Sequence, residues 1–200
     1  QYVGEILTSL NFTGGNNMAK ARIGINGFGR IGRLVARFAQ TNPDLEVVGI
    51  NDVVDLKVLA YLFKYDSAYG PFDGTVEVDG SNLVINGKPI RYTSIMSPAE
   101  LPWGELNVDY AVESTGIFRD TANPAKDPRM HLSAGAKRVV VSAPAKTEAD
   151  VKMLVLGVNH TEFDPAVHTV LSNASCPPPF LPPFFPFLPS PLSLPPFFLP

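Results

Sequence analysis

The 200-residue chain contains very little cysteine, since Cys176 is its one thiol. A single cysteine excludes a framework of disulfides within the chain and fits a reducing compartment. An excess of one charge is also lacking, because 16 lysines and arginines nearly balance 19 aspartates and glutamates, for a net charge of -3. The composition therefore gives no electrostatic reason to expect a nucleic acid or an anionic membrane as partner.

The segment 177–200 lacks charge altogether and consists of eleven prolines, six phenylalanines, five leucines and two serines. So many prolines exclude a membrane-spanning helix, because proline lacks the backbone donor and clashes with the preceding turn. These four residue types are the ones encoded by codons made only of C and T. That composition favours a translated polypyrimidine tract, from a retained intron or a frameshift. A proline-rich ligand for SH3- or WW-type domains is the alternative, and in both cases we expect a disordered, low-complexity tail.

The segment 1–17, before Met18, lacks a starting methionine, a basic stretch and a long apolar run. These absences exclude a typical secretory signal. Upstream read-through, a tag or the end of a transit peptide are the interpretations that remain. We expect this extra segment to be disordered.

Between Met18 and Cys176, short apolar strands alternate with helical patterns. Strands are predicted at 21–27, 45–52, 109–115 and 137–144, helices at 30–40 and 56–63, a hairpin at 82–91, and a weaker, proline-interrupted helix between the last two strands. Such alternation favours an α/β fold of the Rossmann type, a mainly parallel sheet with flanking helices, over residues 18–172.

The segment GINGFGRIGR contains the pattern G-x-G-x-x-G, formed by Gly27, Gly29 and Gly32. It follows a predicted strand, opens a predicted helix and leads to Asp52 at the end of the next strand, which is the context of a dinucleotide-binding fingerprint. Gly27 would permit the tight turn, Gly29 the approach of a pyrophosphate and Gly32 the packing of helix against strand. Asp52 would accept hydrogen bonds from the adenosine ribose and repel a 2′-phosphate, which favours NAD over NADP. A strand-to-helix turn without ligand, with the aspartate capping a loop, is the alternative.

Cys176 ends the stretch LSNASC, whose small polar residues suit the start of a helix. A lone cysteine is more often an inert apolar residue than a nucleophile, so spacing alone does not favour catalysis. No histidine is placed to act as its base. His131, His160 and His168 are predicted to be surface or capping residues.

Several motifs together resemble phosphorylating glyceraldehyde-3-phosphate dehydrogenase. They are ARIGINGFGRIGRLVAR, YDSAYGPF, ESTGIF, GAKRVVVSAPAK, LGVNH and LSNASC, and they extend over most of residues 19–176. The resemblance implies a cytoplasmic or plastid enzyme, homotetrameric in the family, that acts on glyceraldehyde 3-phosphate, inorganic phosphate and NAD, with NADP possible. The product would be 1,3-bisphosphoglycerate.

The resemblance also assigns roles to individual residues. Cys176 matches the nucleophile that forms a thiohemiacetal with the aldehyde; hydride transfer to the nicotinamide leaves a thioester, which phosphate cleaves. Ser175 matches its neighbour in the substrate pocket. The remaining matches concern the cofactor: Arg30 and Ile31 at the pyrophosphate, Asp52 at the ribose, and Thr115, Phe118 and Ser142 along the adenosine and nicotinamide portions. No residue is assigned to a metal.

The chain departs from the family in two ways. Met96 stands where many relatives carry an arginine near the adenine, and Val53 where they carry a proline, which affects adenine contacts and the preference between NAD and NADP. In addition, 173–176 would begin the helix of a catalytic domain, but Pro177 follows where the family continues with two threonines and an asparagine. We therefore expect a fragment whose catalytic domain is missing, which binds NAD weakly and produces no NADH. An erythrose-4-phosphate dehydrogenase relative, or a non-catalytic Rossmann module with an interaction tail, are the alternatives.

Overall fold

The computed structural model describes residues 20–146, 150–155 and 158–173. The predicted segments 1–17 and 177–200 lie outside these residues, as do Ser175 and Cys176.

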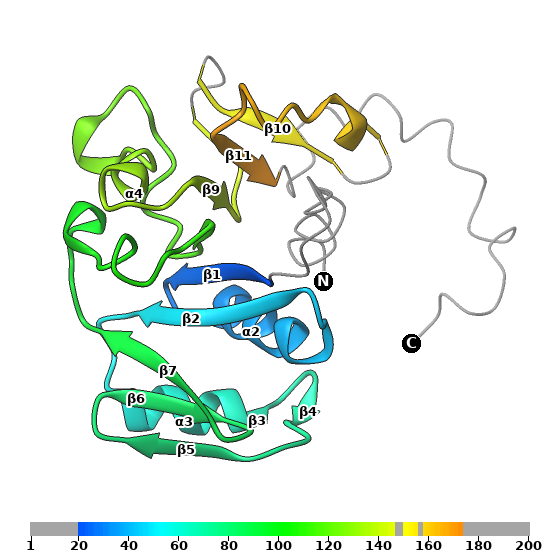
Figure 1. The fold of residues 1–200 in the computed structure, drawn as a ribbon, viewed down its shortest axis with the longest axis vertical. Coiled ribbons are helices and arrows are strands. Elements are labelled where there is room, and N and C mark those ends of the chain that lie inside the picture. The colour runs from blue at the N-terminus through cyan, green and yellow to red at the C-terminus, as the bar shows by residue number, and fades with distance from the viewer. Residues whose placement is uncertain (1–19, 147–149, 156–157, 174–200) are drawn as a thin grey trace, which may run out of the picture.

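A nine-stranded sheet forms the centre of the molecule (Figure 1), in the order β10-β11-β9-β8-β1-β2-β7-β6-β5. The strands are β1 (Ala21–Asn26), β2 (Leu45–Asn51), β5 (Val76–Asp79), β6 (Asn82–Ile85), β7 (Lys88–Thr93), β8 (Tyr110–Glu113), β9 (Arg138–Val141), β10 (Lys152–Leu154) and β11 (Val170–Asn173). Neighbours from β10 through β7 pair in parallel, whereas β6 pairs antiparallel with β7 and with β5. A separate pair, β3 (Tyr65–Asp66) and β4 (Gly70–Pro71), is antiparallel. The predicted mainly parallel sheet is confirmed.

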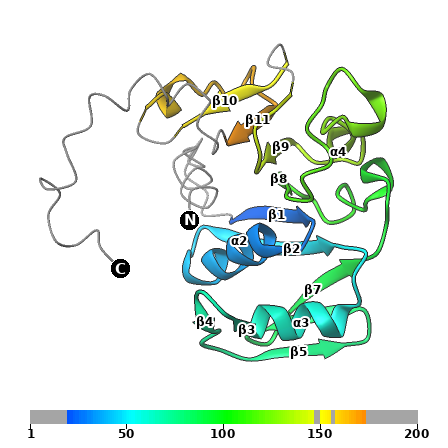
Figure 2. The same ribbon diagram turned by 180° about the vertical axis from the view of Figure 1, so that it is seen from behind.

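Helices α2 (Arg30–Thr41) and α3 (Leu56–Lys64) lie on the same face of the sheet, in front of it in Figure 2. Asp55 begins α3, because its carboxylate accepts hydrogen bonds from the backbone amides of Lys57 and Val58. The residues that α3 buries are Leu56, Leu59, Ala60 and Phe63, which are the apolar residues at helical spacing in this segment of the sequence. No helix in the described parts of the chain combines the length and the apolar character needed to cross a membrane.

The residues that α2 buries differ, apart from Val35, from the large apolar residues at helical spacing in its sequence, which are Ile31, Leu34, Val35 and Phe38. The buried residues are Gly32, Val35, Ala36 and Ala39, whereas Ile31 is 43% exposed. Three of these four residues are small, so the helix can lie close to the sheet. Close packing, rather than the largest apolar side chains, sets the orientation of this helix.

The opposite face of the sheet is covered by the segment between β7 and β8, with Trp103 at its centre. The indole lies against Gly24 and Gly49, which are partners in the β1–β2 pairing. A Cβ atom at either glycine would come within 2.9 Å of the ring. The absence of side chains at these two positions makes room for the chain's one tryptophan, which is 1% exposed.

Two further predictions have different outcomes. The hairpin is confirmed, since β6 and β7 are joined through Asn86 and Gly87, both with positive φ, as a tight hairpin turn requires. The weak, proline-interrupted helix predicted between β8 and β9 is present only as short pieces. These are a 3-10 turn, Pro124–Lys126, and one turn of helix, α4 (Met130–Ser133), because prolines interrupt the backbone hydrogen bonds. Other 3-10 turns lie at Pro98–Glu100 and His160–Glu162.

Candidate dinucleotide-binding site

The three glycines of the fingerprint occupy three different environments. Gly27 has a φ of +88°, a conformation that favours glycine, and a Cβ there would lie 2.7 Å from the Thr115 backbone nitrogen. A Cβ at Gly32 would lie 2.2 Å from the carbonyl oxygen of Gly27, so helix and loop touch at this point. At Gly29 a Cβ would meet nothing within 4 Å. The surface at Gly29 is therefore open to a ligand, as the fingerprint predicts.

Helix α2 begins directly after Gly29, which has no side chain to cap it, and no acidic residue lies in the first turn. The first amide groups of a helix lack partners within the helix, and its dipole is positive at this end. Arg30 and Ile31, both exposed, provide two of these amides. Arg33, one turn further on, donates to the Phe28 carbonyl oxygen, and burial lowers its pKa from the ordinary value. These features suit an anionic ligand group.

Asp52 lies where β2 ends and holds the glycine loop in place. One carboxylate oxygen accepts from the Phe28 amide at 2.6 Å, and the other from the Val54 amide at 2.9 Å. Each oxygen keeps further acceptor capacity, because a carboxylate oxygen can accept two hydrogen bonds. The side chain thus caps a loop and also offers acceptors, which combines the two interpretations of the sequence.

A cavity of about 390 Å³ lies at the carboxyl ends of β1, β2 and β8. Its lining residues are Asn26, Gly27, Gly29, Asn51, Asp52, Val53, Ile95, Met96, Ser114, Thr115, Ile117, Phe118, Ala125 and Lys126. The connections after β1 and β8 leave for opposite sides of the sheet order, so the cavity occupies a topological switch point. Open parallel sheets bind ligands at such points.

The structure brings together five residues that the sequence predicted for the cofactor: Gly27, Gly29, Asp52, Thr115 and Phe118 all line the cavity. The other predicted residues are not among those that line it.

Arg30, Ile31 and Gly32 belong to the adjoining first turn of α2. Ser142, which follows β9, is not among the lining residues; its amide donates to the Glu113 carbonyl oxygen. Met96 and Val53, the two departures from the family pattern, both line the cavity and are 77% and 63% exposed.

The sequence prediction for His131 is wrong. Instead of lying at the surface, its side chain is fully buried between Trp103 and Glu113. Asn26, Asn51 and Glu113 were missed altogether, although each stands at or beside a strand end that faces the cavity. Polar residues at the carboxyl ends of predicted parallel strands were the available signal. His160 and His168 are partly exposed, and His168 accepts from the Asp164 amide.

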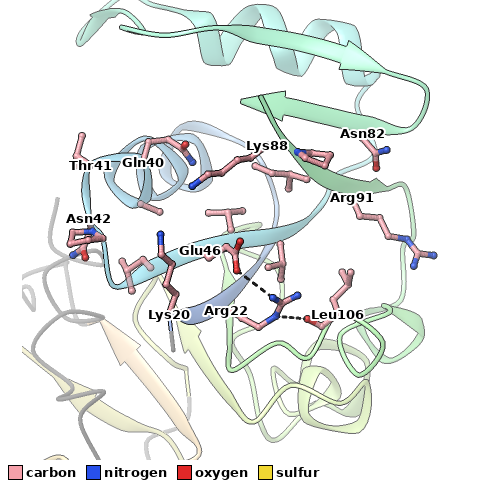
Figure 3. Close-up of a pocket in the computed structure, with 17 residues that line it drawn as sticks. Lys20, Arg22, Gln40, Thr41, Asn42, Glu46, Asn82, Lys88, Arg91 and Leu106 are labelled. Atoms are coloured by element: carbon pink, nitrogen blue, oxygen red, sulfur yellow. Dashed lines mark hydrogen bonds and ion pairs between the residues drawn. The ribbon is translucent and has the colours of Figure 1, made fainter. Parts of the chain in front are cut away.

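A second cavity, of about 520 Å³, opens at the amino ends of the strands, between β2, β7 and the end of α2 (Figure 3). Lys20, Lys88 and Arg91 lie around it. Arg22 is engaged, since it contacts Glu46 and the Leu106 carbonyl oxygen. This edge is opposite to the one where parallel sheets bind dinucleotides. Within the described residues, no group of three or more histidine, cysteine or acidic side chains could hold a metal ion.

A glycine loop, an open helix start and a switch-point cavity beside an acidic strand end define a dinucleotide-binding domain of the Rossmann class. Residues 21–121 match the family model described as glyceraldehyde 3-phosphate dehydrogenase, NAD binding domain. The chain belongs to this family, whose cofactor is NAD.

Similar curated proteins carry the same family name. A glyceraldehyde-3-phosphate dehydrogenase 1 of Trichormus variabilis is 54% identical over 159 residues, which cover 80% of this chain and 45% of the relative. A cytosolic enzyme of Trypanosoma brucei brucei is 54% identical over 157 residues, covering 78% and 44%. The Geobacillus stearothermophilus enzyme is 54% identical over 155 residues, with the same coverage of 78% and 44%. The chain thus spans less than half the length of these relatives.

Proposed function

We propose that the chain binds NAD in the 390 Å³ cavity at the switch point. The pyrophosphate would lie over Gly29, against the first amides of α2, and Asp52 would accept from the adenosine ribose. Thr115 and Phe118 would line the cofactor from the β8 side. The observation that supports this most is the open surface at Gly29, in a loop whose other two glycines are tightly packed.

We further propose that the chain belongs to an enzyme that converts glyceraldehyde 3-phosphate and inorganic phosphate to 1,3-bisphosphoglycerate. NAD would supply the hydride acceptor. Cys176 would attack the aldehyde carbon, and phosphate would release the acyl group from sulfur and regenerate the thiol; Ser175 would stand beside the thiol in the substrate pocket. The support is the family membership together with the SNASC segment. A homotetramer and a cytoplasmic location belong to the same proposal, supported by the family and by the cytosolic relative.

The cofactor proposal is tested by calorimetric titration of the 200-residue chain with NAD and with NADP. We expect saturable, weak binding of NAD, and weaker binding of NADP because the Asp52 carboxylate repels a 2′-phosphate. No binding of either nucleotide by a folded sample would overturn the proposal.

The catalytic step is tested by NADH formation from glyceraldehyde 3-phosphate and phosphate. The 24 residues that follow Cys176 contain no histidine, threonine or charged group. The tested segment therefore offers the thiol no base after Cys176 and the substrate no charged group. We expect the 200 residues to bind NAD without forming NADH. Robust turnover that is lost in Cys176→Ser would contradict this expectation for the chain, and it would support the role of the thiol.

A further inference from the structure

A line of hydrogen bonds between buried side chains leads from Trp103, behind the sheet, to the wall of the dinucleotide cavity. Trp103 Nε1 lies 2.9 Å from His131 Nδ1, and His131 Nε2 lies 3.0 Å from Glu113 Oε2. From the other direction, Asn51 Nδ2 donates to Asn26 Oδ1 at 2.7 Å, and Asn26 Nδ2 donates to Glu113 Oε2 at 2.6 Å. All five of these residues are buried, with exposed fractions of 4% or less.

The arm through His131 has a fixed direction. An indole N–H can only donate, so Nδ1 of His131 must accept and carries no proton. The ring proton is therefore on Nε2, which donates to Glu113. The tryptophan thus selects the tautomer of a buried histidine.

The arm through the asparagines has a fixed direction as well. The backbone amide of Ile95 can only donate, and it lies 2.9 Å from Asn51 Oδ1. That contact orients the Asn51 side chain, so its nitrogen faces Asn26 Oδ1. The Asn26 nitrogen is thereby turned toward Glu113. The two series of hydrogen bonds thus begin at groups that can only donate, the Trp103 indole and the Ile95 amide. Both series end at the same oxygen of Glu113, Oε2.

The second oxygen of Glu113 accepts from Thr115, through both its backbone amide and its hydroxyl. The same hydroxyl accepts from the Ile117 amide at 3.1 Å. Its hydrogen is therefore used within the protein, and what it can offer a ligand is a lone pair. Glu113 itself does not line the cavity, but its partners Asn26 and Thr115 do. Asn51, the partner of Asn26, lines the cavity as well.

We propose that Glu113 is a positioning residue for the dinucleotide. Its buried carboxylate fixes the polar groups that Asn26, Asn51 and Thr115 present to the cofactor, and it makes the Thr115 hydroxyl an acceptor for a donor group of the ligand. The proposal deepens the NAD-binding function proposed above and rests on it.

The first test is Glu113→Gln, which preserves size and shape. A glutamine must place its NH₂ either against the donors of His131 and Asn26 or against those of Thr115, so one set of hydrogen bonds is lost. We expect the Kd for NAD to rise about tenfold, as the loss of one hydrogen bond to a charged group implies. The ligand-free protein gives a second readout, since the Thr115 amide should exchange with solvent about tenfold faster in the variant.

The matched control is Val139→Ala. Val139 is fully buried in β9, within a cluster of valines that includes Val141, Val151 and Val170, and its side chain cannot form a hydrogen bond of the network. This variant should lower the midpoint of thermal unfolding while the Kd for NAD stays unchanged. An equal Kd for wild type and Glu113→Gln, at a temperature where both are folded, would overturn the proposal. So would a rise in Kd of the same size in Val139→Ala.

His131→Leu provides an independent test and replaces Glu113→Gln if that variant does not fold. His131 does not line the cavity, and its hydrogen bond to Glu113 is what connects it to the residues that do. We expect NAD to bind several-fold more weakly to His131→Leu, because Glu113 loses one donor. Unchanged NAD affinity in this folded variant would contradict the positioning role.

Failure of the proposed function has a different signature. If the folded wild-type chain does not bind NAD, that function is wrong, yet the network can still be examined by nitrogen-15 NMR of the ligand-free histidines. We expect His131 to show an unprotonated Nδ1 and a protonated Nε2. A proton on Nδ1 would overturn the inferred direction of the network itself.

Discussion

A methyl group added at Gly29 and one added at Gly32 would meet opposite surroundings, although only two residues lie between these glycines. Gly29→Ala has free space and an ordinary backbone conformation, so we expect stability to change by less than about 0.5 kcal/mol. The methyl group would nevertheless occupy the surface proposed for the pyrophosphate. Calorimetry should show NAD binding weakened about tenfold or more.

Gly32→Ala should behave differently, because the new Cβ would lie 2.2 Å from the Gly27 carbonyl oxygen, which belongs to the backbone. Helix and loop must move apart, and we expect a loss of about 3 kcal/mol in the free energy of unfolding. Urea denaturation of the two variants side by side measures the difference. Equal stability of Gly29→Ala and Gly32→Ala would contradict the tight contact between helix and loop.

Tyr110 sets an alkaline limit to stability. Burial raises the pKa of its hydroxyl above the ordinary value of 10.0. Because the folded state keeps the proton more tightly than the unfolded chain, this contribution is complete below pH 10 and is lost as the pH rises through the folded pKa. We expect wild type to lose stability above pH 10, and Tyr110→Phe to lose less. Tyr61→Phe, at a tyrosine that is 63% exposed, is the control that should follow wild type in denaturation measured across this pH range.

At the scale of elements, the close approach of Trp103 to the sheet depends on paired glycines. Gly24→Ala would place a Cβ 2.9 Å from the indole ring, so the ring must shift within a well-packed layer. We expect a loss of about 1–3 kcal/mol, as overpacking usually causes. Gly104→Ala is the control, because its Cβ would meet neighbours only at 3.6 Å or more and the residue is exposed. A Gly24→Ala variant as stable as Gly104→Ala would show that the ring can adjust freely.

Periodicity predicted α3 well and α2 less well, for a physical reason. The large apolar residues of α3 are the ones that fill the core, so their spacing marks its buried side. In α2 the contact is made by Gly32, Ala36 and Ala39, and small residues carry little weight in a hydrophobic pattern. The cavity glycines and Asp52 were predictable because strand, turn and helix follow one another locally. The Glu113 network was not, since its five members come from five separate segments that only the fold brings together.

At the scale of the whole molecule, binding should stabilise the fold that forms the cavity. Strands β1, β2 and β8 each end at it, and they occupy the middle of the sheet. A ligand that binds only the folded state, present at about 100 times its Kd, adds about 2.7 kcal/mol to stability. For a chain of this size we expect the melting temperature to rise by about 5–10 °C. Differential scanning calorimetry with NAD measures the shift, and Gly29→Ala at the same NAD concentration should show about half of it if its Kd is tenfold higher.

The buried hydrogen bond between Trp103 and His131 has a practical consequence. Because the chain holds one tryptophan, all of its indole fluorescence comes from this position. The indole N–H donates to His131, which in turn donates to Glu113, the residue that binds side chains of the cavity wall. We therefore expect the emission of the unlabelled protein to change with the state of those bonds. It would give this domain an intrinsic optical probe for the arrival of a ligand at the carboxyl edge of the sheet.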